Sequence, residues 1–493
     1  MTGPAPGSLA STARPPEPTT YAKCGVTLLF IVASLFLLVV LPVVVRGAPL
    51  RDDFDVCLSP RWTSGAERML AELWPEWGAV RLLGRFIEQS IIGDLCGAVP
   101  FGAIIAIPLL TTFAVAFVLR GLLYDLEIPK PWPEIGTALW FLQPLGTEAS
   151  LWPVALHIPL GLLLALVALR LYRHGRVAPA AVSSLAACWN LEQVLFALPL
   201  AVWVVTPERH RRRAIVVSSV VFLVLLTIFM RWPGGSTRTA VPLTDRILAI
   251  VTDPLWYVQY PAIGTGAVSI PLAVRWAFPW SVLALAVGSL LGVRYAPVLF
   301  PGQSSGGRQS GAFLRPALAF ASLAVLVSLP MMLTLPHEHG PRVFTPVWLL
   351  LASFTAVGGS RIAWRRVRLA GGLAGLFAAG ALLSLAFSVW VRLETADFTE
   401  SASRWIGARV REGDRVVICD VPRTAVSPAP NGPFALHDFH EIWSAEGAIQ
   451  YYSGRRVHVD RAGVYWDPNC ANLLPADLVV NFEDLRRRWL SER

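Results

Sequence analysis

The chain has few charged residues for its length. Only 15% of its 493 residues are Asp, Glu, Lys or Arg, whereas 54% are hydrophobic and the mean hydropathy is +0.54. A soluble protein carries charges at about a quarter of its positions. The scarcity of charge therefore excludes a soluble globular protein and predicts an all-α polytopic membrane protein.

Several sequence signals are also missing. The chain has no P-loop, GxGxxG, HExxH or GxSxG pattern, so the common nucleotide-binding and hydrolytic schemes have no support. The first apolar run, Cys24 to Val45, is long enough to cross a bilayer, and no small-residue cleavage site closes it. We interpret it as a retained membrane helix. The net charge of +9 comes from arginines in short loops, which fits a membrane protein and no nucleic-acid partner.

The chain divides into three parts. Residues 1–20 are rich in Pro, Ser, Thr and Ala, and we expect a disordered cytoplasmic N-terminus there. Residues 21–396 form the predicted transmembrane domain, with about eleven transmembrane or re-entrant segments. From residue 397 the chain is polar, and "GDRVVICDVP" predicts a strand of alternating type, so 397–493 is expected to be a small α/β domain. Apolar runs after the first lie at 97–119, 135–147, 151–171, 178–206, 214–230, 273–299, 313–335, 343–361 and 370–391.

Arginine clusters in short loops set the orientation, because such loops stay in the cytoplasm. The clusters lie near 170–176, 209–213, 308–315 and 361–368. They place the N-terminus in the cytoplasm, the first loop (47–96) outside, and the C-terminal domain outside.

The run 178–206 must go out and back to keep the arginines on one side. Its halves, 179–190 and 193–206, are each too short to cross alone, at about 18–21 Å. The turn between them, "NLEQ", is therefore predicted at membrane depth, against protein or a wet cavity.

The six cysteines fit this topology. Cys57 and Cys96 fall in the first external loop, Cys419 and Cys470 in the external domain, and the other two in apolar runs. Paired cysteines outside the membrane indicate an oxidising compartment and two disulfides.

Ionisable residues gather on the predicted external side. Groups of this kind are costly near a bilayer and are often functional. Asp55, beside the expected disulfide, is more easily explained as structural than as reactive. The set comprises Asp52, Asp53 and Asp55 after the first helix, Glu148 and Glu192 in two turns, and His337, His339 and Arg342 in "PHEHGPRVF".

Each of these residues also has a structural explanation. The aspartates can simply solvate an interface, Glu148 can cap a helix, and Arg342 can extend to the headgroups. His337 and His339 alternate along a loop and would point apart if the loop is extended, so no metal is expected there.

Four stretches carry a resemblance to a known family. They are "RDDFD" (51–55), "ALWFLQPLGTEASLW" (138–152), "WNLEQVLFALPLAV" (189–202) and "PRVFTPVWLL" (341–350). Their order and common side resemble the C-type (GT-C fold) integral-membrane glycosyltransferases, in the protein O-mannosyltransferase-like and aminoarabinose transferase-like branch. Two positions depart from the family pattern: Gln143 replaces the usual histidine, and Asn190-Leu191 replaces Ser-Lys, which removes one cation expected at the carrier headgroup.

The resemblance implies transfer of a hexose or pentose from a polyprenyl-phosphate donor to an acceptor hydroxyl on a glycan, lipid or protein, at the external face. It implies no cofactor and no metal. Asp52, or else Asp53, would be the general base, and Arg342 would bind the donor phosphate. Glu148, Glu192, His337 and His339 would line the substrate pocket. The expected setting is the inner membrane and cell envelope of a bacterium, in contact with membrane lipids.

Two other functions remain open. A transporter or flippase for a lipid-linked sugar would also need broken helices and intramembrane charge, although it predicts repeated halves that the sequence does not show. A structural partner of a cell-wall assembly complex would tolerate replacement of the aspartates. The C-terminal domain is either a lid that positions substrate or a stabilising cap.

Overall fold

Helices dominate the computed structural model. It describes residues 18–50, 52–62, 82–142, 147–231, 322, 323, 326, 345–359, 367–419, 442–460 and 477–492. The elements are α1 (Pro18–Arg46), α2 (Asp52–Trp62), α4 (Leu82–Phe86), the π-helical η1 (Ile87–Ile92), α5 (Gly93–Ala98), α6 (Phe101–Asp125), α7 (Trp132–Phe141), α8 (Thr147–Leu151), the 3-10 turn η2 (Pro153–Ala155), α9 (His157–Arg173), α10 (Val177–Asn190), α11 (Glu192–Val205), α12 (Glu208–Arg231), α16 (Thr345–Gly359), α17 (Val367–Gly407), β1 (Arg415–Cys419), α18 (Ile442–Ser453), β2 (His458–Asp460), β3 (Leu478–Asn481) and α19 (Phe482–Ser491).

Within the part of the chain that the structure describes, three helical stretches are long and apolar enough to cross a membrane. They are Lys23–Arg46, Phe101–Asp125 and Pro153–Arg173. Two shorter apolar helices, Glu192–Val205 and Thr345–Val357, accompany them. These features support a membrane protein. The predicted segments 273–299 and most of 313–335 lie outside the described residues, so the count of about eleven stays a prediction.

Helix α1 ends where it meets the start of α6. Gly47 adopts φ +57, a left-handed conformation that glycine accepts without strain, and its N–H donates to the carbonyl of Val43 at 3.0 Å. A Cβ on Gly47 would lie 2.8 Å from the backbone nitrogen of Gly102. The two helices therefore approach closely here, and glycine is needed for the contact.

The run 178–206 folds as two antiparallel half-helices, α10 and α11. Each has 14 residues and is about 21 Å long. The Arg173 guanidinium at the end of α9 donates to the carbonyl of Val205 at the end of α11, at 3.1 Å. At the other end, a Cβ on Gly161 would lie 2.6 Å from the Cβ of Leu191. The turn after Asn190 thus lies at the end of the bundle opposite Arg173.

The two ends of the bundle differ in chemistry. We call the end with Arg170 and Arg173 the arginine end; there Arg170 pairs with Asp125 at 2.7 Å. We call the other end the α2 end; it holds the first turn of α9, the last turn of α10 and helix α2. Arginine counting predicts that the arginine end faces the cytoplasm, and this orientation stays a prediction.

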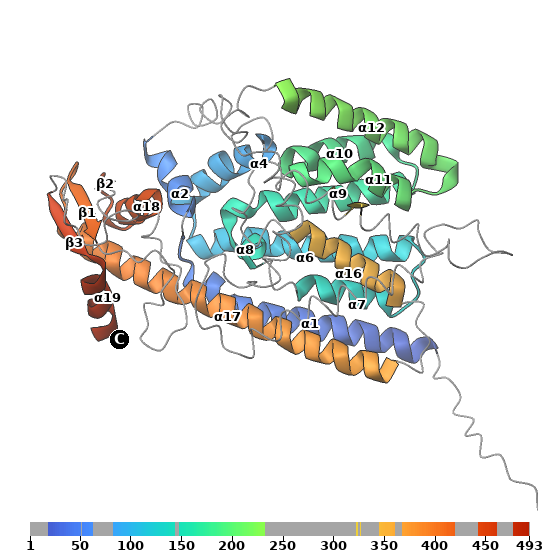
Figure 1. Cartoon of the computed structure of the whole chain (residues 1–493), viewed down its shortest axis with the longest axis horizontal. Coiled ribbons are helices and arrows are strands. Elements are labelled where there is room, and N and C mark those ends of the chain that lie inside the picture. Colours follow the sequence, from blue (N-terminus) through green and yellow to red (C-terminus); the bar gives the residue numbers. More distant parts are fainter. Residues whose placement is uncertain are drawn as a thin grey trace, which may run out of the picture.

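A long helix joins the bundle to the C-terminal segment. Helix α17 is continuous over 41 residues, about 60 Å, and packs along α1 (Figure 1). The domain boundary predicted at residue 397 falls inside it. The C-terminal segment is therefore attached to the bundle through an unbroken helix, which fixes where the segment lies relative to the bundle.

The C-terminal segment contains a three-stranded parallel sheet in the order β2-β1-β3. Its core is formed by Phe398 of α17, Ile418 of β1 and Trp489 of α19, among others. The strand predicted in "GDRVVICDVP" is β1, but four of its five residues are buried, so the predicted alternation is wrong. The reason is its central place in a parallel sheet, which exposes neither face.

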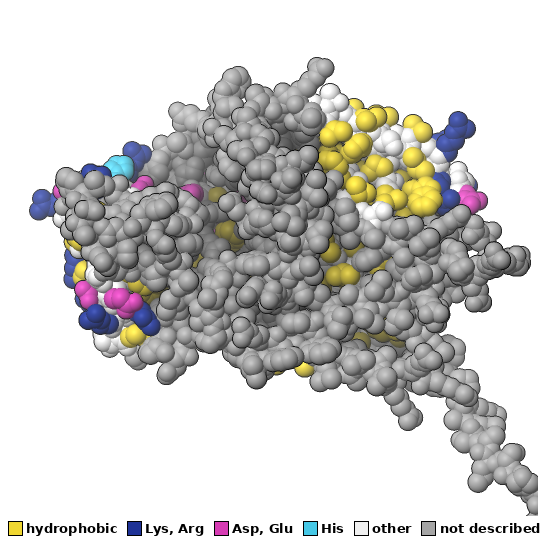
Figure 2. Space-filling view, viewed as in Figure 1, with side chains coloured by type: hydrophobic (Ala, Val, Ile, Leu, Met, Phe, Trp, Pro, Cys, Tyr) yellow, Lys and Arg dark blue, Asp and Glu magenta, His cyan; other side chains and the backbone are white. Residues whose placement is uncertain are grey.

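The surface separates apolar from charged regions. Hydrophobic side chains gather where α12 runs, whereas charged side chains gather around the strands and α19 (Figure 2). The exposed apolar residues of α12 include Val216, Val220, Leu223 and Val224. An exposed apolar helix suits lipid contact, and the charged sheet suits water.

The α1–α17 contact is held by ion pairs. Arg46 bonds Asp397 at 2.7 Å and also bonds Glu400, which is paired with Arg404 at 2.9 Å. Partial burial of Glu400 would raise its pKa, but the hydrogen bonds from Arg46 and Arg404 outweigh burial and hold the pKa below its ordinary value of 4.5.

We predict a pH-dependent contribution of Arg46 to stability. A carboxylate with a lowered pKa stabilises the fold above its ordinary pKa, and this contribution is lost as pH falls below about 4.5. Arg46→Gln should lower the free energy of unfolding by about 1 kcal/mol at pH 7, because the pair is partly exposed. The difference from the wild type should shrink as pH falls below 4.5.

Thermal unfolding in detergent at pH 7 and at lower pH measures this difference. Arg487→Gln is the matched control, because Arg487 is 76% exposed and pairs with Asp484 only at 3.8 Å. An Arg46→Gln effect that is equal at all pH values would contradict the prediction.

Candidate functional site

The acidic helix α2 is fixed by a local hydrogen-bond pair at its start. Asp53 is 1% exposed; its Oδ2 accepts from the N–H of Leu50 at 3.1 Å, and its own N–H donates to the carbonyl of Leu50 at 3.0 Å. Asp55 is exposed. Asp52 is the first residue of α2, and its side chain lies outside the described set. Because the Asp53 carboxylate is engaged in holding the backbone, it is poorly available as a base.

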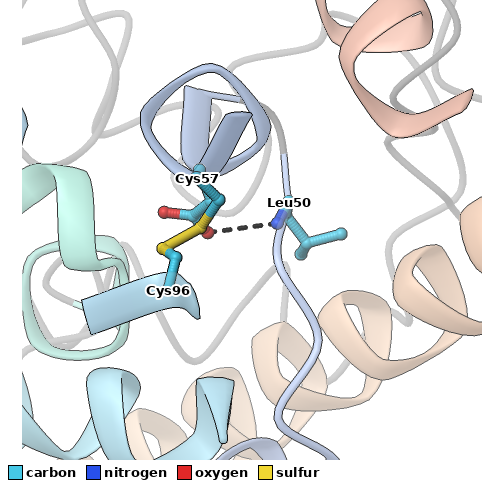
Figure 3. The surroundings of a disulfide bond; sticks show 4 residues. Leu50, Cys57 and Cys96 are labelled. Carbon is cyan, nitrogen blue, oxygen red and sulfur yellow. Dashed lines mark hydrogen bonds between the residues drawn. A yellow bond between two sulfur atoms is a disulfide. The ribbon is translucent and has the colours of Figure 1, made fainter. Parts of the chain in front are cut away.

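A disulfide joins α2 to α5. Cys57 and Cys96 are bonded across 39 residues of sequence, next to the hydrogen bond to Leu50 N (Figure 3). This is one of the two pairings predicted from the topology. Cys419 is also disulfide-bonded, and Cys470, its predicted partner, lies outside the described residues.

The C-terminal segment packs directly on α2. Phe54 is fully buried, with ring centroids 5.7 Å from Tyr451 and 6.1 Å from Tyr452 of α18. A Cβ on Gly447 would lie 2.8 Å from the Cβ of Phe54 and 3.6 Å from Oδ1 of Asp55. This contact is compatible with both roles that the sequence leaves open for the C-terminal segment, a lid that positions substrate or a stabilising cap. It makes the position of the acidic helix depend on α18.

A buried carboxylate–imidazole pair lies at the same end of the bundle. His157 Nδ1 is 2.5 Å from Oε1 of Glu88 and 3.1 Å from the carbonyl of Val154. The side chains are 8% and 2% exposed. Since a carboxylate and a carbonyl both accept, Nδ1 carries the proton and Nε2 is left for another partner.

Glu88 comes from an unusual backbone segment. It is the second residue of η1, and π-helical turns of this kind are frequent at functional sites. Segment η1 contacts α2, α5 and η2. The pair therefore lies next to the disulfide-tethered acidic helix.

Amide and acid side chains of the turn between α10 and α11 complete the group. Asn190, Glu192 and Gln193 are all buried. Nδ2 of Asn190 donates to the carbonyl of Ala186 at 2.9 Å. A Cβ on Gly84 of α4 would lie 2.7 Å from the Cβ of His157 and 3.6 Å from Oδ1 of Asn190, so these two side chains are neighbours. We call Glu88, His157 and Asn190 the buried polar cluster.

The structure places some of the predicted site residues. Asp53 and Asp55 lie on α2, and Glu192 begins α11 at the α2 end. Glu148 lies in α8, but its side chain is not described, and His337, His339 and Arg342 lie outside the described residues. Their roles stay predictions. Within the described ranges, no three His, Cys, Asp or Glu side chains gather as metal ligands.

The buried polar cluster is what the sequence interpretation missed. His157 stands inside the apolar run 151–171, and an ionisable residue in such a run is a signal of function that could have singled it out. Glu88 gave less signal, because it lies in the long first loop. Its pairing with His157 depends on a contact across 69 residues.

Ionisable residues also meet at the arginine end. Glu134 is fully buried and accepts from Tyr124 and from Arg120, the latter at 3.0 Å. These contacts join α6 to α7. Oε2 of Glu134 and Nε of Arg120 are also buried and make no hydrogen bond within the described residues. Because this group lies at the end of the bundle away from the acidic helix α2, we place the candidate site at the α2 end.

Two comparisons with known proteins found no match. No protein-family model matches the chain, and no curated protein matches it. The resemblance to C-type glycosyltransferases therefore depends on the four sequence stretches alone.

We predict that the Cys57–Cys96 disulfide stabilises the α2 end. Closing a loop of this length contributes about 2 to 4 kcal/mol by restricting the unfolded chain. The double variant Cys57→Ser/Cys96→Ser should therefore unfold at a lower temperature. A reducing agent should lower the unfolding temperature of the wild type more than that of the variant, which keeps only the bond of Cys419.

Cys24→Ser is the matched control, because Cys24 is an exposed free cysteine. It should unfold like the wild type. Equal unfolding temperatures for the double variant and the wild type would contradict the prediction.

Proposed function

We propose that this protein is a membrane glycosyltransferase. It transfers a hexose or pentose from a polyprenyl-phosphate donor to a hydroxyl of a glycan, lipid or protein acceptor at the outer face of a bacterial inner membrane. The observation that carries the proposal is the position of α2: an acidic helix, tethered by a disulfide, adjoins a buried polar cluster at one end of an apolar bundle. The four resembling stretches support the same function.

The reaction needs a base for the acceptor hydroxyl. A carboxylate within hydrogen-bond reach of that hydroxyl can take its proton as the oxygen attacks the anomeric carbon. Since Asp53 holds the backbone of Leu50, we assign the base to Asp52 and a positioning role to Asp53. Asp55 has no role in the proton transfer.

The reaction also needs a partner for the leaving group. The leaving group is a lipid phosphate, and a guanidinium binds its oxygens bidentately and neutralises the developing charge. We assign this role to Arg342, and the sugar pocket to Glu148, Glu192, His337 and His339. The chemistry requires no metal or organic cofactor.

A lipid-linked-sugar transporter is the second candidate. The half-helices α10 and α11, which meet at a buried turn, favour it, because transporters place substrate where membrane helices are interrupted. The two functions differ in one measurable way: a transporter moves the lipid-linked sugar without forming a new glycosidic bond.

We expect Asp52→Asn to lower kcat about 100-fold or more in purified protein given a polyprenyl-phosphate sugar and an acceptor, because the amide cannot take the proton. Asp53→Asn should lower activity less, since the amide oxygen still accepts from Leu50. Asp55→Asn, an exposed acid on the same helix, is the matched control and should keep full activity.

Radiolabelled sugar transfer measures these rates, and a liposome assay with the same donor measures movement across the bilayer. Full activity of Asp52→Asn would contradict the general-base assignment. Movement of the donor with no transfer to any acceptor would favour the transporter.

A further inference from the structure

The buried polar cluster has hydrogen-bonding capacity beyond its internal contacts. Nδ1 of His157 is used by Glu88 and Val154, and Nε2 makes no hydrogen bond within the part of the chain that the structure describes. The Nδ2 of Asn190 is used by Ala186, whereas its buried Oδ1 has no hydrogen-bond partner among the same residues. Both side chains flank Gly84, so two hydrogen-bonding atoms that make no bond within the described residues belong to neighbouring side chains.

Burying polar side chains without hydrogen-bond partners lowers the stability of the fold. Asn190 is fully buried, and a buried polar atom that lacks a hydrogen bond costs about 1–3 kcal/mol. The pair Glu88–His157 adds two ionisable groups inside an apolar assembly. Apolar residues at these positions would give a more stable bundle. A ligand that completes the hydrogen bonds would explain why polar residues occur there instead.

The packing also fixes where these atoms lie. A Cβ on Gly84 would be 2.7 Å from His157, so only glycine lets α4 approach α9 and α10 this closely. The carboxylate of Glu88 holds the imidazole in one tautomer and one orientation, as second partners of functional histidines do. The imidazole therefore has one orientation set by contacts within the protein.

The available atoms match a hydroxyl. Imidazole Nε2 accepts a hydrogen bond when it carries no proton, and an amide oxygen also accepts one. Both are uncharged groups that can bind a hydroxyl by accepting a hydrogen bond from it. We propose that Glu88, His157 and Asn190 form a binding subsite for the sugar hydroxyls of a lipid-linked sugar, with His157 and Asn190 in contact with the sugar and Glu88 as a positioning residue. The proposal deepens the proposed function, on which it rests for the identity of the ligand's carrier.

Binding of three lipids to the intact purified protein tests this assignment. The probes are decaprenyl phosphate, decaprenyl phosphomannose and decaprenyl phosphoarabinose, and the quantity is the ratio of Kd for the bare lipid to Kd for the better sugar-bearing lipid. In the wild type we expect a ratio of about 10 or more, since each hydrogen bond contributes about a factor of ten. His157→Phe and Asn190→Leu should each bring the ratio toward 1.

The bare lipid is an internal control for folding, because a variant that still binds it retains the bundle. Glu88→Gln should reduce the ratio less than His157→Phe, since the amide oxygen can still orient Nδ1. Ser184→Ala, at another fully buried polar residue of α10, is the matched control and should keep the wild-type ratio.

Three outcomes overturn the subsite. They are a wild-type ratio near 1, an unchanged ratio in both His157→Phe and Asn190→Leu, and an equal loss of affinity for bare and sugar-bearing lipids, which would assign the cluster to the phosphate. Because the ratio is measured without transfer, a sugar preference in a protein that transfers nothing would contradict the proposed enzyme and leave the subsite standing.

Discussion

The attachment of α2 is the constraint on which the α2 end of the molecule depends. This short helix is too polar to be held by lipid, and it is held instead by three different contacts: the Leu50–Asp53 hydrogen bonds, the Cys57–Cys96 disulfide and the packing of Phe54 against α18. Each contact joins it to a different part of the chain. Together they hold α2 against η1 and so fix the position of its acids relative to the buried polar cluster.

The bundle beneath α2 is organised by the cost of charge near lipid. At the arginine end, Arg170 and Arg173 pair with acids or carbonyls of neighbouring helices, so the guanidinium groups link helices to one another. At the α2 end, acids and amides predominate among the buried polar groups. The half-helices α10 and α11 connect the two, because their turn brings Asn190 and Glu192 to the α2 end and returns the chain to the arginines.

Several elements could be predicted because their signals are local. The split of 178–206 into two halves follows from arginine parity and from the length that a bilayer requires, and the half-helices begin and end within two residues of the predicted limits. Strand β1 was recognisable, but its burial was not, since its neighbours β2 and β3 lie about 40 and 60 residues further along the chain. The boundary at 397 was placed by polarity, whereas α17 continues to Gly407 because its polar turns pack on the C-terminal core.

The candidate site was only half visible for the same reason. The acidic stretch "RDDFD" can be recognised in the sequence as a candidate site, and so can Glu192, because it lies within an apolar run. What the sequence alone determined is that apolar helices form near 24–46, 97–119 and 151–171, as a membrane protein requires, and that 178–206 divides into two halves, because these signals depend on residues close together in the chain. Only the tertiary structure decided that Asp53 holds the backbone and that Glu88, His157 and Asn190 meet, because those contacts join elements far apart in the chain and depend on side-chain packing.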